Sequence, residues 1–253
     1  LEVVEVIWIT GDTHGGWIHR LNMDSFPEQR EMSKDDYVII LGDFGIWRDS
    51  PQQRWYLNWL EEKHFTTLFI DGNHENYDVL DSYPVEEWHG GKVHFIKPSV
   101  IHLMRGQIFD IDDLKFFTFG GAASHDISDG ILCPDNWKEK AKELERQGKY
   151  GFRVKDISWW KEELPTEEEM KHGMDVLKRN NNIVDYIISH SPSTSELYLI
   201  GGVGLYETDV LTNYLEEIKA TTNYKKHFFG HMHVDQAINS ESICLYEQII
   251  RII

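Results

Sequence analysis

Apolar residues occur along the chain in short runs, each of which ends in a polar and usually glycine-containing turn. Five of these runs are rich in β-branched and aromatic residues, which is typical of strands that are buried on both faces. They cover residues 3–9, 37–41, 67–70, 183–189 and 227–229. We expect each of these runs to be a β-strand.

Other stretches of the chain have helical spacing of apolar residues. Residues 51–64 mix helical spacing with turns, and residues 208–219 are periodic. The clearest helix is predicted over residues 166–179, where Thr166 and Glu169 have the spacing of a capping box. Helices between successive buried strands indicate βαβ units and a mostly parallel sheet.

The pattern changes to short strands without helices between residues 93 and 121, and the tail at 242–253 looks similar. Strands without intervening helices favour antiparallel pairing. We therefore expect an α/β fold with two sheets in a single domain that covers residues 1–253. The irregular residues 124–164 are predicted to form an insertion over the rim, in which the alternating charges of residues 138–149 indicate a solvated helix face.

Composition narrows the class of protein. With 25 basic and 43 acidic residues, the chain of 253 residues has a formal net charge of −18, which argues against binding bulk nucleic acid or an anionic membrane. A hydrophobic content of 41% excludes intrinsic disorder. No apolar run approaches the ~20 residues of a membrane span, and residues 1–9 do not resemble a signal peptide. The two cysteines, Cys133 and Cys244, are too few for a disulfide framework, so we expect a cytoplasmic protein.

Each of the five buried strands is followed by side chains that bind metals. These are Asp12 and His14, Asp43, Asn73 and His74, His190, and His231 and His233. Because the carboxyl ends of parallel strands meet in one crevice, we expect these side chains to converge. Oxygen and imidazole ligands without thiolates suit Mn, Fe or Zn. Glycines precede several ligand positions, at residues 11, 42, 72 and 230, and they allow turns that a Cβ would hinder.

The order of these motifs resembles the calcineurin-like metallophosphoesterases, and the resemblance runs from Gly11 to His233. It implies a four-layer α/β/β/α sandwich of two mixed β-sheets flanked by helices, with two metal ions at the strand ends. By matching position, the resemblance implies the following roles: Asp12, His14 and His233 hold the first metal; Asn73, His190 and His231 hold the second; and Asp43 bridges both. It also implies that His74 lies beside the scissile phosphate, where it stabilises or protonates the leaving group.

The implied chemistry is metal-dependent hydrolysis of phosphate esters. Two metal ions clamp the attacking and leaving oxygens, and a bridging water, with its pKa lowered toward ~7, attacks phosphorus as hydroxide. The neutral amide of Asn73 leaves the site with a net positive charge, which favours an anionic phosphate. Asp43 and His74 are the predicted catalytic residues.

One block departs from the protein-phosphatase branch of the family. Ile46 stands where that branch has an aspartate that orients the catalytic histidine, and Arg48 comes one residue later than the phosphate-binding arginine. Arg48 is still a candidate for substrate binding, with a surface ion pair as the alternative. Asp49 is a candidate to orient His74.

Two further features are candidates for substrate contact. Trp17 and Trp47 follow the metal motifs and could wall the pocket, although packing is the alternative. His125 or Asp126 could reach the substrate, although a plain turn is the alternative.

We expect the substrates to be phosphomonoesters, including phosphoserine or phosphothreonine in proteins. The alternative is a phosphodiesterase, or a hydrolase of nucleotides or dinucleoside polyphosphates. The expected partners are thus a phosphorylated small molecule, a nucleotide or a phosphoprotein. A non-catalytic scaffold is disfavoured because every ligand position is intact. The sequence does not indicate an oligomeric state.

Overall fold

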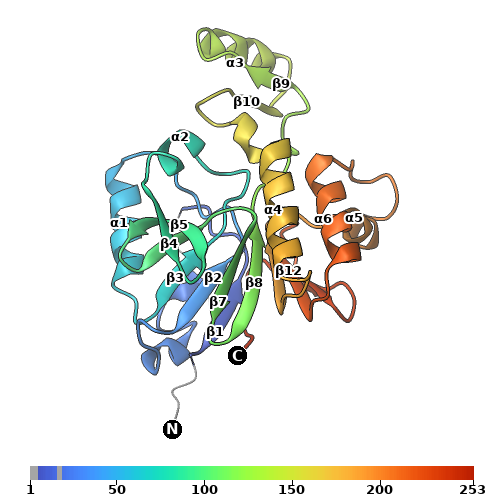
Figure 1. The fold of residues 1–253 in the computed structure, drawn as a ribbon. Coiled ribbons are helices and arrows are strands. Elements are labelled where there is room, and N and C mark those ends of the chain that lie inside the picture. Colours follow the sequence, from blue (N-terminus) through green and yellow to red (C-terminus); the bar gives the residue numbers. More distant parts are fainter. Residues whose placement is uncertain (1–4, 16–18) are drawn as a thin grey trace.

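The computed structural model describes residues 5–15 and 19–253. Two large mixed sheets pack against each other, and helices cover their outer faces (Figure 1). This arrangement confirms the predicted α/β/β/α sandwich. Trp17 and the first two residues of the strand predicted at 3–9 lie outside the described residues.

The first sheet, as far as the structure describes the chain, has seven strands, and its central strands run parallel. Its spatial order is β15 (Ile249–Arg251), β1 (Ile7–Thr10), β2 (Tyr37–Ile40), β3 (Thr66–Phe69), β6 (Val100–Leu103), β5 (Gly91–Lys97) and β4 (Val85–Trp88). The edge strands β15 and β4, and β5 beside β4, pair antiparallel with their neighbours.

The second sheet has six strands within the described residues. Its order is β13 (Gln236–Ala237), β14 (Ser242–Cys244), β12 (Lys226–Phe229), β11 (Tyr186–Ser189), β8 (Leu114–Phe119) and β7 (Gln107–Ile111). Strands β14, β12, β11 and β8 run parallel, and β13 and β7 are the antiparallel edges.

The predicted antiparallel pairing of residues 93–121 and of the tail is correct only in part. The hairpins β5–β6 and β7–β8 are antiparallel, but β6 also pairs parallel with β3, and β8 with β11. In the tail, β15 pairs antiparallel with β1, whereas β14 is parallel to β12. The physical reason is that β5 runs antiparallel to both β4 and β6, so β6 enters the sheet from the same end as β4 and β3 without a helix directly before it. The absence of a helix therefore did not exclude parallel pairing.

Alternating side chains explain why these strands are apolar on both faces. Ile7 and Ile9 of β1 belong to the core between the sheets, which also contains Phe109 of β7. Trp8, between them, points the other way and packs in the core under α1. This period of two is the geometry of a strand, so a sheet in the middle of four layers needs apolar residues at every position.

The helices predicted at residues 51–64, 166–179 and 208–219 are present close to those positions, and the structure adds shorter helices that were not predicted. Their bounds are α1 (Pro51–Glu61), α2 (Tyr77–Leu80), α3 (Trp137–Arg146), α4 (Glu167–Arg179), α5 (Thr194–Gly201) and α6 (Val210–Thr221), with 3-10 turns at His19–Leu21, Pro27–Arg30 and Lys161–Glu163. The predicted capping box of α4 is present. No helix in the described ranges has the length and apolarity that crossing a membrane requires.

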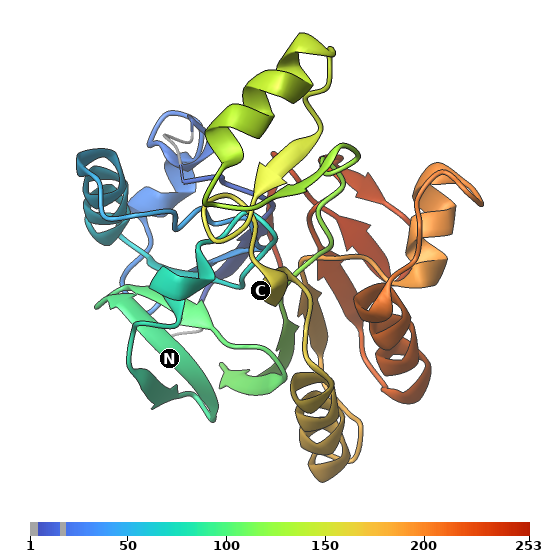
Figure 2. The same cartoon turned by 90° about the horizontal axis from the view of Figure 1, so that it is seen from above.

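Residues 124–164 lie above the ends of the strands (Figures 1 and 2). They include α3 and a separate pair of short parallel strands, β9 (Gly130–Leu132) and β10 (Phe152–Val154). Leu132, Ala141 and Val154 form a small core of their own, and most of α3 is exposed. This segment is therefore an ordered unit placed over the edge where the predicted ligands occur.

Candidate metal centre

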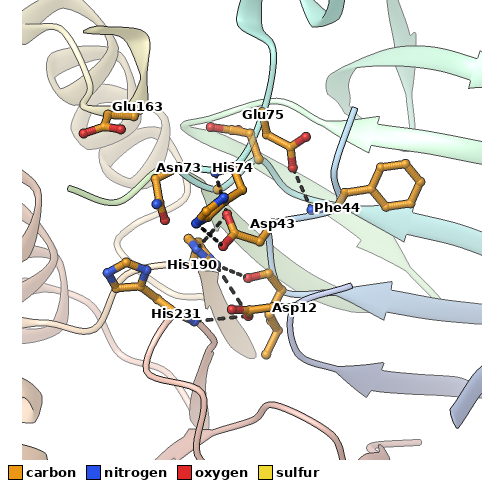
Figure 3. A network of polar contacts seen from close by, with 12 residues as sticks. Asp12, Asp43, Phe44, Asn73, His74, Glu75, Glu163, His190 and His231 are labelled. Carbon is orange, nitrogen blue, oxygen red and sulfur yellow. Dashed lines mark hydrogen bonds and ion pairs between the residues drawn. The ribbon is translucent and has the colours of Figure 1, made fainter. Parts of the chain in front are cut away.

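The predicted ligands come together between the two sheets. Asp12 and His14 follow β1, Asp43 follows β2, and Asn73 follows β3, all in the first sheet. His190 follows β11, and His231 and His233 follow β12, in the second sheet. Figure 3 shows Asp43 and His190 in the middle, with Asn73 and His74 at one end and Asp12 and His231 at the other.

The carboxylate of Asp43 lies at the centre of this group. It is 1% exposed, and its Oδ1 lies 3.3 Å from Nε2 of His190. Its Oδ2 lies 3.8 Å from Nδ1 of His14 and 4.0 Å from Nε2 of His74. The two oxygens thus face different sets of imidazoles, which is the position that a bridging ligand requires.

One side of the group could hold a metal ion without rearrangement. The ligand atoms of Asp12, His14, Asp43 and His233 all lie within 4.8 Å of one another. Nε2 of His233 is 3.1 Å from Oδ2 of Asp12 and 3.3 Å from Nε2 of His14. Carboxylates and imidazoles in this arrangement suit a transition-metal ion.

The other side contains buried ligand atoms that have no hydrogen-bond partner among the described residues. These atoms are Nε2 of His190 and Oδ1 of Asn73. Nδ1 of His190 lies 2.6 Å from the carbonyl oxygen of Leu41, to which it donates, so Nε2 is the ring nitrogen that faces the ligand group. The amide nitrogen of Asn73 donates to Oγ of Ser124 at 3.3 Å, which directs its oxygen toward the group. Because unpaired buried acceptors are costly, these atoms fit a site for a cation.

The backbone beneath the ligands is held in unusual conformations. His14, Asp43, His231 and His233 have φ values of 53°, 44°, 65° and 51°. Such values are strained for residues with a side chain, and they persist only where the surroundings enforce them. A Cβ at Gly72 would collide with the carboxylate of Asp43, so glycine there permits the close approach.

Glu75 helps to hold the backbone at Asp43 in its unusual conformation. The sequence analysis assigned Glu75 no role. Its buried carboxylate accepts hydrogen bonds from the backbone N–H groups of Phe44, Gly45 and Ile46, at 2.7 to 3.2 Å (Figure 3). These bonds fix the turn that carries Asp43.

The surroundings of His74 differ from the expectation. The carboxylate of Asp49 pairs with Arg54 at the surface, so the hypothesis that Asp49 orients His74 is wrong. Instead, Nη2 of Arg153 lies 2.7 Å from Nε2 of His74. Sequence reasoning missed Arg153, because it lies 79 residues from His74 in a segment without a regular pattern.

The other candidates for substrate contact are divided between two cavities. Arg48 is exposed and lines a cavity of about 300 Å³ together with His14 and Trp47. His125 and Asp126 line a cavity of about 290 Å³ above Asp43, in which Nε2 of His125 lies 2.9 Å from Nε2 of His231. Asp126 pairs with Arg153, with 2.6 Å between Oδ1 and Nε.

Comparison with known proteins identifies the family. A family model for calcineurin-like phosphoesterases matches residues 6–235. The chain belongs to this family. It is therefore a metal-dependent phosphoester hydrolase, as the motifs predicted. No curated protein matches its sequence. Among solved structures, it is similar to phosphopantetheinyl hydrolase from Mycobacterium tuberculosis, with 15% identity and a TM-score of 0.45 over 98% of this chain and 92% of that chain.

The electrostatics of this calcineurin-like phosphoesterase favour positive charge between its carboxylates. Burial alone would lower the pKa of His190, but Asp43 and Asp12 beside it raise that pKa to about 9. Burial lowers the pKa of His14 and of His231 below the usual value, so these rings are neutral, as metal ligands must be. The carboxylates thus stabilise a positive charge on His190, and a metal ion bound at its Nε2 would replace that proton, whereas His14 and His231 are already neutral.

The imidazole of His74 is also neutral in this arrangement. Burial, together with the charges of Arg153 and His14, lowers its pKa to about 4 against the effect of Asp43. Arginine can only donate, so Nε2 of His74 accepts from Arg153. His74 therefore lies at the edge of the ligand group and contacts a cation of the inserted segment.

Proposed function

We propose that this phosphoesterase hydrolyses phosphomonoesters at a dinuclear centre of Mn, Fe or Zn. One metal would be held by Asp12, His14 and His233, the second by Asn73, His190 and His231, and both by Asp43. The observation that carries this proposal is the position of Asp43, whose two oxygens face different sets of ligands. When bound, such a pair of ions lowers the pKa of water and stabilises the charge that develops on phosphate oxygens.

The residues of the chain have separate tasks in this proposal. The ligands would hold the ions. The carboxylate of Glu75 accepts hydrogen bonds from the backbone next to Asp43 and so keeps Asp43 in place. His74 lies 4.0 Å from Asp43, outside both ligand sets, where its imidazole would stabilise the leaving oxygen. Protonating that oxygen from Nε2 would require a proton on Nε2 in place of its hydrogen bond from Arg153. Such a general acid contributes about 10²–10⁴-fold to the rate.

The lining of the cavity above Asp43 supports a monoester. The residues that line it are Asp43, Asn73, His74, His125, Asp126, Arg153, His231 and His233, all of them polar. A lining of polar residues, one of them the arginine Arg153, suits a terminal phosphoryl group. Phosphorylated small molecules and phosphoserine or phosphothreonine side chains fit this requirement.

A second observation favours the alternative substrates. The neighbouring cavity, which reaches the centre at His14, contains Trp47, Arg48 and Ile157. An aromatic ring beside a guanidinium could take the base of a nucleotide or the second substituent of a diester, with Arg48 binding a further phosphate. Nucleotides, dinucleoside polyphosphates and diesters are therefore the competing class.

A comparison of two aryl substrates tests the proposal. The Mn²⁺-loaded protein should hydrolyse 4-nitrophenyl phosphate with a higher kcat/KM than bis(4-nitrophenyl) phosphate. Asp43→Asn should lose most of this activity, on the order of 10²-fold or more, because a carboxylate at the centre of the ligand group is replaced by an amide.

Asp49→Asn is the matched control, since it makes the same change at an exposed carboxylate six residues away that pairs with Arg54. It should keep the activity of the unchanged protein. A clear preference for the diester in the metal-loaded protein would refute the proposed substrate class.

A further inference from the structure

The inserted segment places a buried cation in the cavity above Asp43. Arg153 belongs to β10, is 6% exposed, and lies 2.7 Å from His74. It is the only lysine or arginine among the described residues that line this cavity. The chain has a net charge of −18, which repels an anionic ligand, whereas the positive charge of Arg153 attracts one to this cavity.

The guanidinium of Arg153 is held in place and is not saturated. Its Nε lies 2.6 Å from Oδ1 of Asp126, Nη1 donates to the carbonyl of Ser158 at 3.4 Å, and Nη2 donates to His74. A guanidinium has five N–H donors. Nη2 also lies 3.4 Å from Nδ1 of His74, so the contacts within the described residues leave at least one N–H, on Nη1, for another acceptor.

The segment around Arg153 is built to keep this position. β10 pairs with β9 at three residue pairs, and the N–H of Gly151 donates to the carboxylate of Asp129 at 3.0 Å. At the ends of the segment, Ser124 bonds to Asn73, and Arg105 donates to the carbonyl of Glu162. Arg153 is thus carried by an ordered element that is tied to the ligand group.

We propose that Arg153 binds the third unesterified oxygen of a phosphomonoester and thereby sets the preference for monoesters over diesters. This inference rests on the proposed function. A monoester has three unesterified oxygens, of which two can face the two metal sites while one remains for the guanidinium. A diester has only two such oxygens, so it leaves Arg153 without an acceptor. A planar guanidinium is well suited to a phosphoryl oxygen because it donates from two nitrogens.

Two substitutions test this role in the Mn²⁺-loaded protein. Arg153→Gln should lower kcat/KM for 4-nitrophenyl phosphate by about 10²-fold, the size of loss seen when one preorganised donor to a developing oxyanion is removed. The loss for bis(4-nitrophenyl) phosphate should be less than a tenth as large. Arg153→Lys, which keeps the charge but not the fork, should lie between. Inorganic phosphate should bind Arg153→Gln at least tenfold more weakly in a calorimetric titration, and the metal content should not change.

Lys155→Gln is the matched control. It removes one positive charge from an exposed side chain two residues further along. It should change neither the ratio of kcat/KM for the monoester to kcat/KM for the diester nor the affinity for inorganic phosphate. Equal losses for both substrates, with unchanged phosphate affinity, would show that Arg153 acts only through His74 and would overturn the inference. If Arg153→Gln does not fold, the same comparison with Arg153→Lys decides.

The result that would refute the proposed function differs from the result that would refute the role of Arg153. An unchanged protein without monoester activity would refute that function, whereas the phosphate titration would still show whether Arg153 binds a phosphoryl group.

Discussion

At the scale of single residues, the orientation of Asn73 depends on side chains far away in the sequence. Its amide nitrogen donates to Oγ of Ser124, and that hydroxyl donates to Oε2 of Glu163 at 2.6 Å. Figure 3 shows Glu163 beyond Asn73, on the side away from Asp12. Because an amide can bind a metal only through its oxygen, this pair of hydrogen bonds decides which end of Asn73 faces the ligand group.

Removing this support should weaken metal binding. Ser124→Ala deprives the Asn73 amide of its acceptor, so we expect the affinity for one Mn²⁺ to fall by about 10–100-fold, as is usual for groups that orient a ligand. Calorimetric titration of the metal-free protein measures this affinity. Ser82→Ala, at an exposed serine of the first half of the chain, is the control and should leave it unchanged. Normal Mn²⁺ affinity in Ser124→Ala would contradict this account of Asn73.

At the scale of elements, α4 begins directly after the inserted segment, and its start is specified by the capping box. Oγ1 of Thr166 accepts a hydrogen bond from the N–H of Glu169 at 3.2 Å, and the carboxylate of Glu169 accepts one from the N–H of Thr166 at 2.7 Å. Apolar residues of α4, such as Leu177, then cover the outer face of the second sheet. The capping box thus fixes the residue at which the inserted segment ends and α4 begins.

Thr166→Ala should destabilise the protein without affecting its metal centre. An N-cap threonine contributes about 1 kcal/mol, so urea denaturation should show a loss of that size in the free energy of unfolding. Thr166→Ser should restore most of it. Thr221→Ala, at the exposed last residue of α6, removes a hydroxyl that bonds only within its own helix and should cost less than ~0.5 kcal/mol. Equal stability of Thr166→Ala and the unchanged protein would mean that the cap contributes nothing.

At the scale of the whole molecule, two buried carboxylates outside the ligand set are paired with cations. Oε1 of Glu196 lies 2.6 Å from Nζ of Lys219 and 2.9 Å from Nδ1 of His227. Burial would raise the pKa of Glu196, but His227 and Lys219 hold it well below its usual range. Asp71 has the same character, because Arg105 and His102 lower its pKa against the effect of burial.

These lowered pKa values predict a loss of stability in acid. A carboxyl group with a lower pKa in the folded protein stabilises it fully above the ordinary pKa of about 4, and this contribution is lost as the pH falls toward the folded pKa. Glu196→Gln removes the contribution of Glu196. We therefore expect it to be less stable than the unchanged protein by about 3–5 kcal/mol at pH 7, as for a broken buried ion pair, and by less near pH 3.

Thermal unfolding of both chains across this pH range measures the difference. Because the two chains share the same metal ligands, effects of pH on metal binding largely cancel in the comparison. A stability difference that stays constant from pH 7 to pH 3 would rule out ionisation of Glu196 as the cause.

Much of the fold and of the ligand group could be predicted from the sequence, because both depend on patterns that extend over only a few neighbouring residues. Apolar runs such as residues 37–41 specify strands that are buried on both faces, and the residue after each run lies at a strand end whatever the topology. The partition into sheets could not be predicted in this way. β6 and β14 pair parallel because of how distant hairpins and helices pack, and no local pattern specifies that.

The sequence by itself determined which side chains follow which strands, since the alternation of side chains and the turn glycines act over a few residues. Only the tertiary structure decided that His190 would meet Asp43 from the opposite sheet, and that Arg153 would lie against His74 in place of Asp49. The physical reason is that these contacts join segments about 80 to 150 residues apart in the chain. Their formation depends on the packing of two complete sheets and an inserted segment, which no single stretch of the chain encodes.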